Sequence, residues 1–183
     1  MKYHMIAFGL GFLLDLLLGD PYWLFHPIRL IGSLIAFLEK KLRKEKDDTA
    51  KQFQMGILLV VLVLITTLIV ALAILVGAYW LHPIAGIVVE TVMTYQILAT
   101  KCLKVESMKV YAKLREQDLE GARKAVSMIV GRDTECLDET GVAKAAIETV
   151  AENTSDGVIA PMLYTAIGGP VLGFVYKAVN TMD

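Results

Sequence analysis

The sequence has few cysteines, and the two that it has form no recognisable pattern. Cys102 and Cys136 are the only cysteines among 183 residues, and neither belongs to a CxxC motif. Two cysteines without framework spacing exclude the class of small secreted domains that are held together by disulfides. We therefore expect both to be free thiols in a reducing compartment.

The sequence also lacks the glycine patterns of the common nucleotide-binding folds. Neither a Walker-type glycine loop nor a GxGxxG motif is present, so no phosphate-cradling motif argues for nucleotide binding. The formal net charge is −1, which gives no electrostatic reason to expect a nucleic-acid partner. No internal repeat, low-complexity segment or Gly/Ser linker divides the chain, so we expect residues 1–183 to form a single membrane-embedded domain.

Apolar residues are abundant instead. Hydrophobic residues make up 56% of the chain, and a mean hydropathy of +0.57 is too apolar for a typical soluble domain. Residues 53–81 contain no charged side chain, which predicts a transmembrane helix. Residues 5–18 predict a shorter membrane helix. It is not a cleaved signal peptide, because Asp15 interrupts the apolar run and no small-residue cleavage site follows.

Two further apolar segments contain residues that are unfavourable in contact with lipid: an acid in one and a helix-breaking run in the other. Residues 84–103 predict another span, but Glu90 in its middle costs about 2.5–3.5 kcal/mol on insertion scales. We therefore expect Glu90 to face protein or a polar cavity. Residues 158–179 form a membrane segment broken by Gly168-Gly169-Pro170. A broken segment at membrane depth lines a cavity or packs inside a helix bundle.

The positions of the basic residues predict the orientation. Lysines and arginines crowd residues 40–51 and the region from Lys104 onward, which the positive-inside rule places in the cytoplasm. Residues 104–157 then form a cytoplasmic helical insert. Its three expected helices span about 105–116, 119–130 and 139–153, with Asp118 and Asp138 as N-caps and Gly131 as a C-cap.

These segments together predict an all-α fold. We expect a polytopic helical protein of the inner, cytoplasmic membrane, in contact with membrane lipid and with its polar insert in the cytoplasm. Residues 28–42 predict an amphipathic helix in or near the membrane interface, with Leu30, Ile31, Leu34, Ile35 and Leu38 on its apolar side.

An acidic column in the insert is the candidate functional feature. Glu148, Glu152 and Asp156 follow one another at intervals of four residues, so a helix places them on one face. A solvated helix face would explain an ordinary column of this kind. Here a turn-forming run, 153–157, leads directly into the apolar residues 158–161. Carboxylates that end beside a membrane-type segment suit Mg²⁺ carrying phosphates.

The loop before this column offers complementary groups. Gly131-Arg132-Asp133-Thr134 presents a guanidinium, a carboxylate and a hydroxyl at a helix end. We expect Arg132 to stabilise charge on a phosphoryl group, and Asp133 to join the three acids as a metal ligand.

Several blocks in a fixed order resemble one family, the cobinamide-phosphate synthases of cobalamin biosynthesis. The blocks are Gly19-Asp20-Pro21 with Trp23-Leu24, His26-Pro27-Ile28-Arg29-Leu30-Ile31-Gly32, Ile129-Val130-Gly131-Arg132-Asp133-Thr134, Glu148-Thr149-Val150-Ala151-Glu152-Asn153 with Ser155-Asp156-Gly157 and Ala160-Pro161, and Asn180-Thr181-Met182-Asp183. Any single block would be weak, whereas their order and spacing along the whole chain make the resemblance specific. Family members continue beyond the last block with further membrane segments, so a C-terminal half, or a second copy in a homo-oligomer, is expected to complete the protein.

The resemblance implies an integral membrane ligase. It would join adenosylcobyric acid, a corrinoid, to aminopropanol or its O-phosphate through an amide on one propionate carboxylate. ATP and Mg²⁺ would be required.

Site residues follow from the resemblance and the motifs together. The expected catalytic residues are Glu148, Glu152, Asn153, Asp156 and His26. The expected substrate and phosphate contacts are Arg29, Arg132, Asp133, Thr134, Asp20 and Asn180. The expected metal ligands are Glu148, Glu152, Asp156 and Asp133. His26 could take the proton from the attacking ammonium, because the unperturbed pKa of histidine is about 6.5.

A membrane protein without enzymatic activity is the competing interpretation. Glu90 and the broken segment 158–179 would also suit a transporter fragment or a signalling relative on the same scaffold. The clustering of the candidate acids on the cytoplasmic side, away from the bilayer midplane, argues against that interpretation.

Overall fold

The protein is helical throughout the part of the chain that the structure describes. A computed structural model describes residues 2–21, 23–43 and 48–183, in which all regular structure is helical. The elements are α1 (Lys2–Leu18), α2 (Pro27–Leu42), α3 (Thr49–Leu81), α4 (Pro83–Tyr95), α5 (Thr100–Arg115), α6 (Leu119–Ser127), α7 (Glu139–Thr154), the π-helical turn η1 (Ser155–Ile159) and α8 (Ala160–Met182). The predicted all-α class is confirmed.

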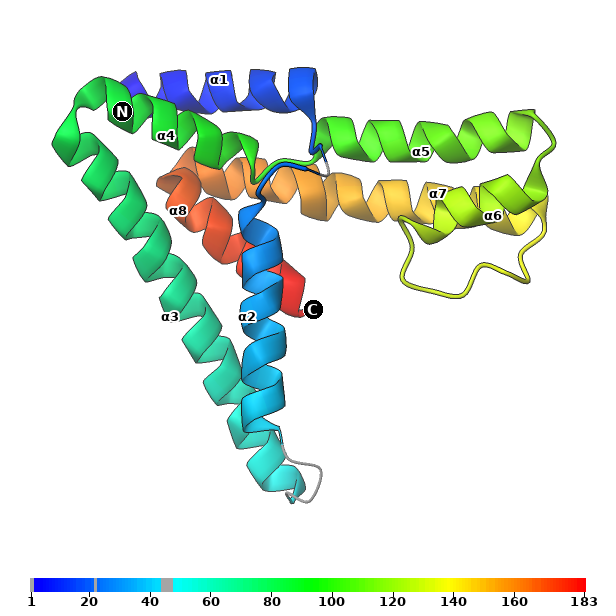
Figure 1. The fold of residues 1–183 in the computed structure, drawn as a ribbon, viewed down its shortest axis with the longest axis horizontal. Coiled ribbons are helices and arrows are strands. Elements are labelled where there is room, and N and C mark those ends of the chain that lie inside the picture. Colours follow the sequence, from blue (N-terminus) through cyan, green and yellow to red (C-terminus); the bar gives the residue numbers. More distant parts are fainter. Residues whose placement is uncertain (1, 22, 44–47) are drawn as a thin grey trace.

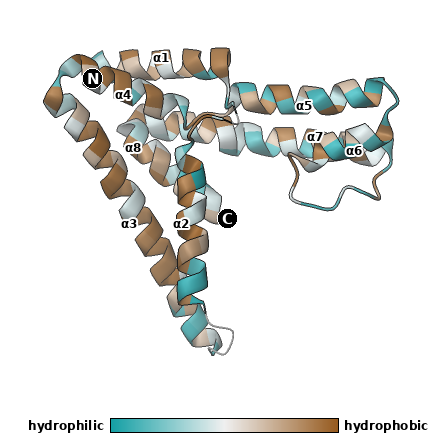
Figure 2. Cartoon of the chain, in the orientation of Figure 1, coloured by the Kyte–Doolittle hydropathy of each residue, from teal (hydrophilic) through white to brown (hydrophobic). Residues whose placement is uncertain are grey.

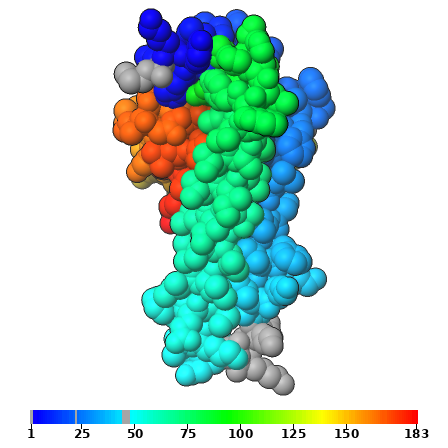
Figure 3. All heavy atoms as spheres, turned by 90° about the vertical axis from the view of Figure 1, so that its left-hand side faces the viewer, coloured from blue at the N-terminus to red at the C-terminus, as the bar shows by residue number. Residues whose placement is uncertain are grey.

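The helices form a membrane-type bundle from which an arm projects. Figure 1 shows α1 and α4 side by side, α2 and α3 running away from them at a steep angle, and α5, α6 and α7 extending to the opposite side as the arm. Apolar residues dominate α3, whereas the arm is mixed and largely hydrophilic (Figure 2). Seen from the α3 side, α3 forms a continuous column with α2 beside it (Figure 3).

Three helical stretches of the described residues are long and apolar enough to cross a membrane. They are Thr49–Leu81, Pro83–Arg115 and Glu139–Met182. The first has 33 residues, about 50 Å of helix, which exceeds the roughly 30 Å hydrocarbon core. The 17-residue α1 is only about 25 Å long, and its crossing of the bilayer stays a prediction.

The predicted span 84–103 is wrong in one respect, because it is not one continuous helix. The chain leaves the helical path after Tyr95 and resumes it at Thr100. Ile97 and Leu98 are each 1% exposed within this break, so burial of these two side chains accompanies the bend. Glu90 is 3% exposed and faces protein, as predicted.

Helix α2 packs largely as its sequence pattern predicts. Ile31 is buried in the bundle core, and Leu34, Ile35 and Leu38 pack against that core. Leu30 is the exception, since it is 54% exposed. The basic residues Lys44 and Lys46 of the predicted cytoplasmic connection lie outside the described residues, and the side of the membrane on which α2 lies stays a prediction.

The arm has a small hydrophobic core of its own. Residues of all three of its helices meet there, namely Val110, Ala122, Val126, Val142 and Ala145. Two predicted N-caps are confirmed, because Asp118 and Asp138 accept hydrogen bonds from the backbone N–H groups of Gly121 and Gly141.

The predicted C-cap at Gly131 is wrong. Helix α6 ends at Ser127, and Met128 is its C-cap. The N–H of Ile129 bonds to the carbonyl of Val126 in a tighter turn. Ile129 and Val130 pack against the arm core, so burial of these side chains accounts for the chain leaving the helix early.

The segment from α7 to α8 differs from the sequence prediction at one place and agrees with it at another. Residues 153–157 continue the helix through η1 instead of forming a loop. The path reverses at Gly168 and Gly169, whose backbone angles are not helical. Figure 1 shows α8 doubling back at this point.

Contacts across α8 confirm the reversal. The Tyr176 hydroxyl donates to the carbonyl of Asp156 at 3.3 Å, although twenty residues of straight helix would separate them by about 30 Å. The rings of Tyr164 and Tyr176 stack with centroids 4.8 Å apart. Helix α8 is therefore a helical hairpin packed inside the bundle, as the broken pattern of 158–179 predicts.

Gly169 should be indispensable for this hairpin. Its φ of 68° and ψ of −174° lie in a region that essentially only glycine occupies. We expect Gly169→Ala to destabilise the protein by about 1–3 kcal/mol, measured as a lower thermal unfolding temperature in detergent.

Gly77→Ala provides the matched control for this substitution. Gly77 lies inside α3, where an added Cβ meets nothing within 4 Å, so alanine should be neutral or slightly stabilising. Equal unfolding temperatures for Gly169→Ala and wild type would contradict the geometry of the turn.

Candidate functional site

The end of α1 is tied to the start of α5. Asp15 is fully buried, and its Oδ2 accepts a 2.9 Å hydrogen bond from the backbone N–H of Thr100. The N-cap residue Ala99 has only a methyl side chain, so Asp15 caps α5 from another helix. The Tyr95 hydroxyl donates to the carbonyl of Gly19, and Lys101 Nζ donates to the carbonyl of Leu17.

Four ionisable residues gather at this place, and we call them the junction cluster: Asp20, His26, Asp156 and Lys177. Asp20 Oδ1 lies 3.4 Å from His26 Nε2, and these side chains are only 16% and 14% exposed. Lys177 is half-buried and directly follows Tyr176, whose hydroxyl donates to the carbonyl of Asp156. It is near enough to Asp20 and Asp156 to interact with them electrostatically. The cluster thus brings together the loop after α1, η1 and the returning half of α8.

One ring nitrogen of His26 is used in a backbone contact, and its role as a proton acceptor stays a prediction. His26 Nδ1 accepts from the backbone N–H of Ile28 at 3.3 Å and so caps α2. A neutral imidazole has one acceptor nitrogen, so its Nε2 carries the proton and faces Asp20. Asp20 Oδ1 is the acceptor group that this nitrogen faces. Within residues 2–21, 23–43 and 48–183 this buried oxygen has no partner of hydrogen-bond geometry.

A second polar feature lies on the arm. Arg132 Nη2 donates to Glu148 Oε2 at 2.9 Å, and Lys144 Nζ lies 3.9 Å from the other carboxylate oxygen of Glu148. The predicted approach of the loop 131–134 to the acidic column is therefore present at Arg132. Both members of the pair are about half exposed, at 54% and 50%, so the pair stabilises the fold by no more than about 1 kcal/mol.

The neighbouring loop residues hold the loop together instead of facing the column. Asp133 is exposed, and its Oδ1 accepts from the backbone N–H of Glu135 at 2.9 Å. Thr134 is 5% exposed and donates to the carbonyl of Arg123 at 3.2 Å. Neither contact directs its polar group toward Glu148.

The four predicted metal ligands are not brought together. Glu148 is paired with Arg132, Glu152 is exposed, Asp156 belongs to the junction cluster, and Asp133 caps its own loop. Eight residues of helix separate Glu148 from Asp156, about 12 Å along the axis. Among the described residues, no group of three or more His, Cys, Asp or Glu side chains is placed to hold a metal ion. This set does not fit a Mg²⁺ site, and we assign no ligand from it.

The remaining predicted site residues lie three positions along the sequence from a member of the junction cluster. Arg29 is exposed on the first turn of α2, three residues after His26. Asn180 is half-buried on the last turns of α8, three residues after Lys177. Asn153 donates to the carbonyl of Thr149 in its own helix.

Lys177 is the residue that the sequence analysis missed. It is the only charged residue in the predicted segment 158–179. A charged residue in such a segment faces the bundle interior or a polar cavity. The same argument that selected Glu90 could therefore have selected Lys177.

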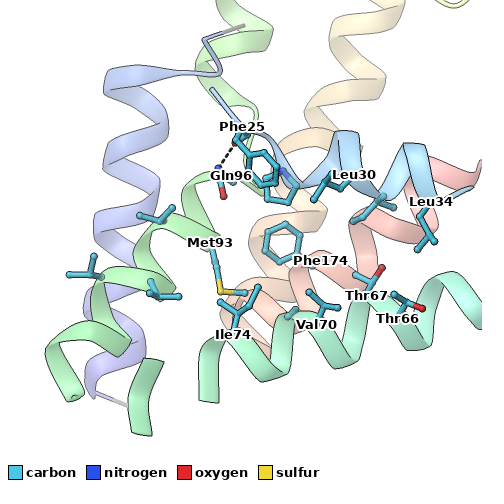
Figure 4. A pocket seen from close by; sticks show the side chains of 16 residues that line it. Phe25, Leu30, Leu34, Thr66, Thr67, Val70, Ile74, Met93, Gln96 and Phe174 are labelled. Atoms are coloured by element: carbon cyan, nitrogen blue, oxygen red, sulfur yellow. Dashed lines mark hydrogen bonds between the residues drawn. The ribbon is translucent and has the colours of Figure 1, made fainter. Parts of the chain in front are cut away.

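An apolar cavity adjoins the junction cluster. It has a volume of about 530 Å³ and lies between α2, α3, α4 and α8. Figure 4 shows Phe174, Met93, Leu30 and Val70 around it, with Gln96 donating to the carbonyl of Phe25. Phe25 and Pro27, the two sequence neighbours of His26, line this cavity.

The Asp15 cap can be tested by two substitutions. Asp15→Ala leaves the Thr100 N–H without its acceptor, and we expect destabilisation of about 1–3 kcal/mol with faster tryptic cleavage near Lys101 and Lys104. Asp15→Asn keeps an acceptor oxygen and should lose less. Equal losses for the two variants would show that the cap is not the stabilising contact.

Comparison with known proteins relates the chain to one family. The CobD/Cbib protein family model matches residues 8–183. Three relatives named "Cobalamin biosynthesis protein CobD" are 46% identical over 179 residues in Clostridium perfringens, 48% over 171 in Geobacter metallireducens and 45% over 182 in Listeria monocytogenes. These alignments cover 98%, 93% and 98% of this chain.

The chain is shorter than these relatives. The same alignments cover 56%, 53% and 56% of the three relatives, so the chain spans about half of their length. No solved structure is significantly similar to it. The match over residues 8–183 shows that the chain belongs to the CobD/Cbib protein family.

Proposed function

We propose that this chain is part of a cobalamin-biosynthetic ligase of the membrane. The complete enzyme would attach aminopropanol, or aminopropanol O-phosphate, to a propionate carboxylate of adenosylcobyric acid. Family membership and the names of the relatives support the pathway. The junction cluster is the observation that supports ligase chemistry, because it provides an Asp20–His26 pair and a half-buried lysine next to an apolar cavity.

The reaction needs an activated carboxylate, because a carboxylate oxygen is a poor leaving group. ATP would supply the phosphoryl group that converts the carboxylate to an acyl phosphate, with release of ADP. The amine nitrogen then forms the C–N bond as the C–O bond to phosphate breaks. The nitrogen must lose a proton, and phosphate leaves with its electron pair.

The residues of the junction cluster have groups suited to these steps. Lys177 would hold the negatively charged carboxylate or phosphate, since an ammonium in a site shielded from water stabilises developing negative charge. Asp20 would accept the proton from the amine through its Oδ1, in place of the His26 role predicted from the sequence. His26 would remain the N-cap of α2, with its Nε2 facing Asp20.

Arg132 has a more distant role in this proposal. About 12 Å of helix separates its partner Glu148 from Asp156, so one phosphoryl group would not contact both Arg132 and the junction cluster in this conformation. We propose that Arg132 contacts the polyphosphate away from the reacting carbon. Magnesium dependence remains a prediction from the resemblance, and no step is assigned to a metal ion.

The orientation of the protein in the cell membrane is proposed on the same grounds. The basic residues 40–51 and the arm would face the cytoplasm, where ATP is available. The junction cluster lies where the arm meets the bundle, so it would lie at the cytoplasmic surface.

Removing the cation of the junction cluster should lower activity strongly without unfolding the protein. We expect Lys177→Met, in the chain extended C-terminally to the length of its relatives, to lower kcat about 10²-fold or more. Amide formation in membranes from labelled aminopropanol phosphate, ATP and adenosylcobyric acid measures this. Lys124→Met, on the exposed face of α6, should be unaffected. Full activity of Lys177→Met would remove the cluster from the mechanism.

Arg132 should contribute through its planar guanidinium. Arg132→Lys keeps the charge but loses bidentate geometry, and we expect a higher KM for ATP with a smaller change in kcat. Arg123→Lys offers a comparison on the same arm, because Arg123 donates to the carbonyl of Leu137 and should affect stability alone. A silent Arg132→Lys would exclude the polyphosphate contact.

Two assays separate the ligase from the transport alternative. Adenosylcobyric acid and amine should give an amide only when ATP is present, with the extended protein in membranes. Solute uptake into liposomes without ATP and without amide formation would favour a transporter on the same scaffold.

A further inference from the structure

Three polar side chains meet at the end of the bundle opposite the junction cluster. His4 Nδ1 lies 2.6 Å from Glu90 Oε1, and the Tyr79 hydroxyl donates to Glu90 Oε2. They come from α1, α4 and α3, and the turn of α8 lies against them. A Cβ on Gly169 would lie 3.9 Å from Glu90 Oε1 and 4.0 Å from His4 Cε1.

The turn of α8 contains a carbonyl that has lost its regular helical donor. In a helix the carbonyl of Ala166 would accept from the N–H of residue 170, but Pro170 has no N–H. Ala166 is exposed, so its carbonyl needs a hydrogen-bond donor from outside the regular helical pattern. His4 Nε2 lies 3.2 Å from this carbonyl oxygen.

The two contacts of His4 together determine where its proton lies. A carbonyl oxygen only accepts hydrogen bonds, so Nε2 must carry a proton. Nδ1 then either donates to an ionised Glu90 or accepts from a protonated one. In both cases Nδ1 and Glu90 share one proton, and Glu90 holds the imidazole so that its Nε2–H points at Ala166.

We propose that His4 latches α1 onto the reversing turn of α8, by supplying through Nε2 the hydrogen bond that Pro170 cannot make. Glu90 and Tyr79 orient this donor. The latch fixes the direction in which α8 returns and thereby the position of Lys177 at the other end of the hairpin. This role is independent of the reaction that the junction cluster performs.

A simpler alternative is that His4 only compensates the buried charge of Glu90. The two explanations differ in which ring nitrogen matters. A glutamine side chain places an N–H near the position of Nε2, whereas asparagine places its polar end near Nδ1. His4→Gln therefore keeps the bond to Ala166, and His4→Asn keeps a bond to Glu90.

Amide hydrogen exchange of the peptide 163–175 in nanodiscs tests the latch. We expect His4→Asn to accelerate exchange of this peptide roughly three- to tenfold, the effect of one lost hydrogen bond, and His4→Gln to stay close to wild type. Peptides of the arm should be unchanged in both variants. Wild-type exchange in both variants, or equal acceleration in both, would overturn the proposal.

A measurement on the unsubstituted chain covers the case in which His4→Asn does not fold. The ¹⁵N chemical shifts and one-bond N–H couplings of the His4 ring should show a proton on Nε2. An imidazole with an unprotonated Nε2 would overturn the latch, because no hydrogen bond to Ala166 could then form. His82 at the exposed start of α4 provides the reference histidine.

Discussion

The backbone reversal at Gly168 and Gly169 is the constraint on which the rest of the structure depends. A straight helix would carry Lys177 about 30 Å away from Asp156, whereas the hairpin returns it to the neighbourhood of Asp156 and Asp20. The junction cluster therefore exists because one glycine adopts a conformation that other residues essentially never adopt. A local backbone property thus determines which side chains meet.

Buried acids attach α1 to the bundle at both of its ends. At one end the Asp15 carboxylate caps α5, and at the other His4 meets Glu90 from α4. Acids in an apolar bundle are stable only when they are paired or hydrogen-bonded. These two contacts consequently define the register of α1 along α4 more narrowly than apolar packing could, because hydrophobic contacts are not directional.

Much of the fold could be predicted from local sequence signals. The uncharged run 53–81, the N-caps Asp118 and Asp138, and the break before Pro170 each depend on the chemistry of a few neighbouring residues, and each is confirmed. The bend after Tyr95 and the early end of α6 could not be predicted, because they accompany burial of side chains against distant helices.

The candidate site was harder to predict than the fold. Helical spacing shows which side chains share a face of a helix, but it does not show which residues of other helices they contact. The column from Glu148 to Asp156 has the predicted spacing, yet its members meet different neighbours: Arg132 on the arm and Lys177 on the returning helix. Lys177 lies 21 residues after Asp156 in the sequence, and only the reversal of α8 brings the two together. The backbone cap that His26 makes on α2 is a contact that no spacing rule predicts.

The reversal can be tested directly by cysteine labelling from one side of the membrane. In a background of Cys102→Ser and Cys136→Ser, cysteines would replace the exposed residues Ser155 and Thr181, one at a time, with Leu81→Cys as the reference for the other side. In sealed vesicles an impermeant maleimide should label Ser155→Cys and Thr181→Cys from the same face, and Leu81→Cys from the opposite face. Labelling of Ser155→Cys and Thr181→Cys from opposite faces would show that α8 crosses the bilayer, and the hairpin would be wrong.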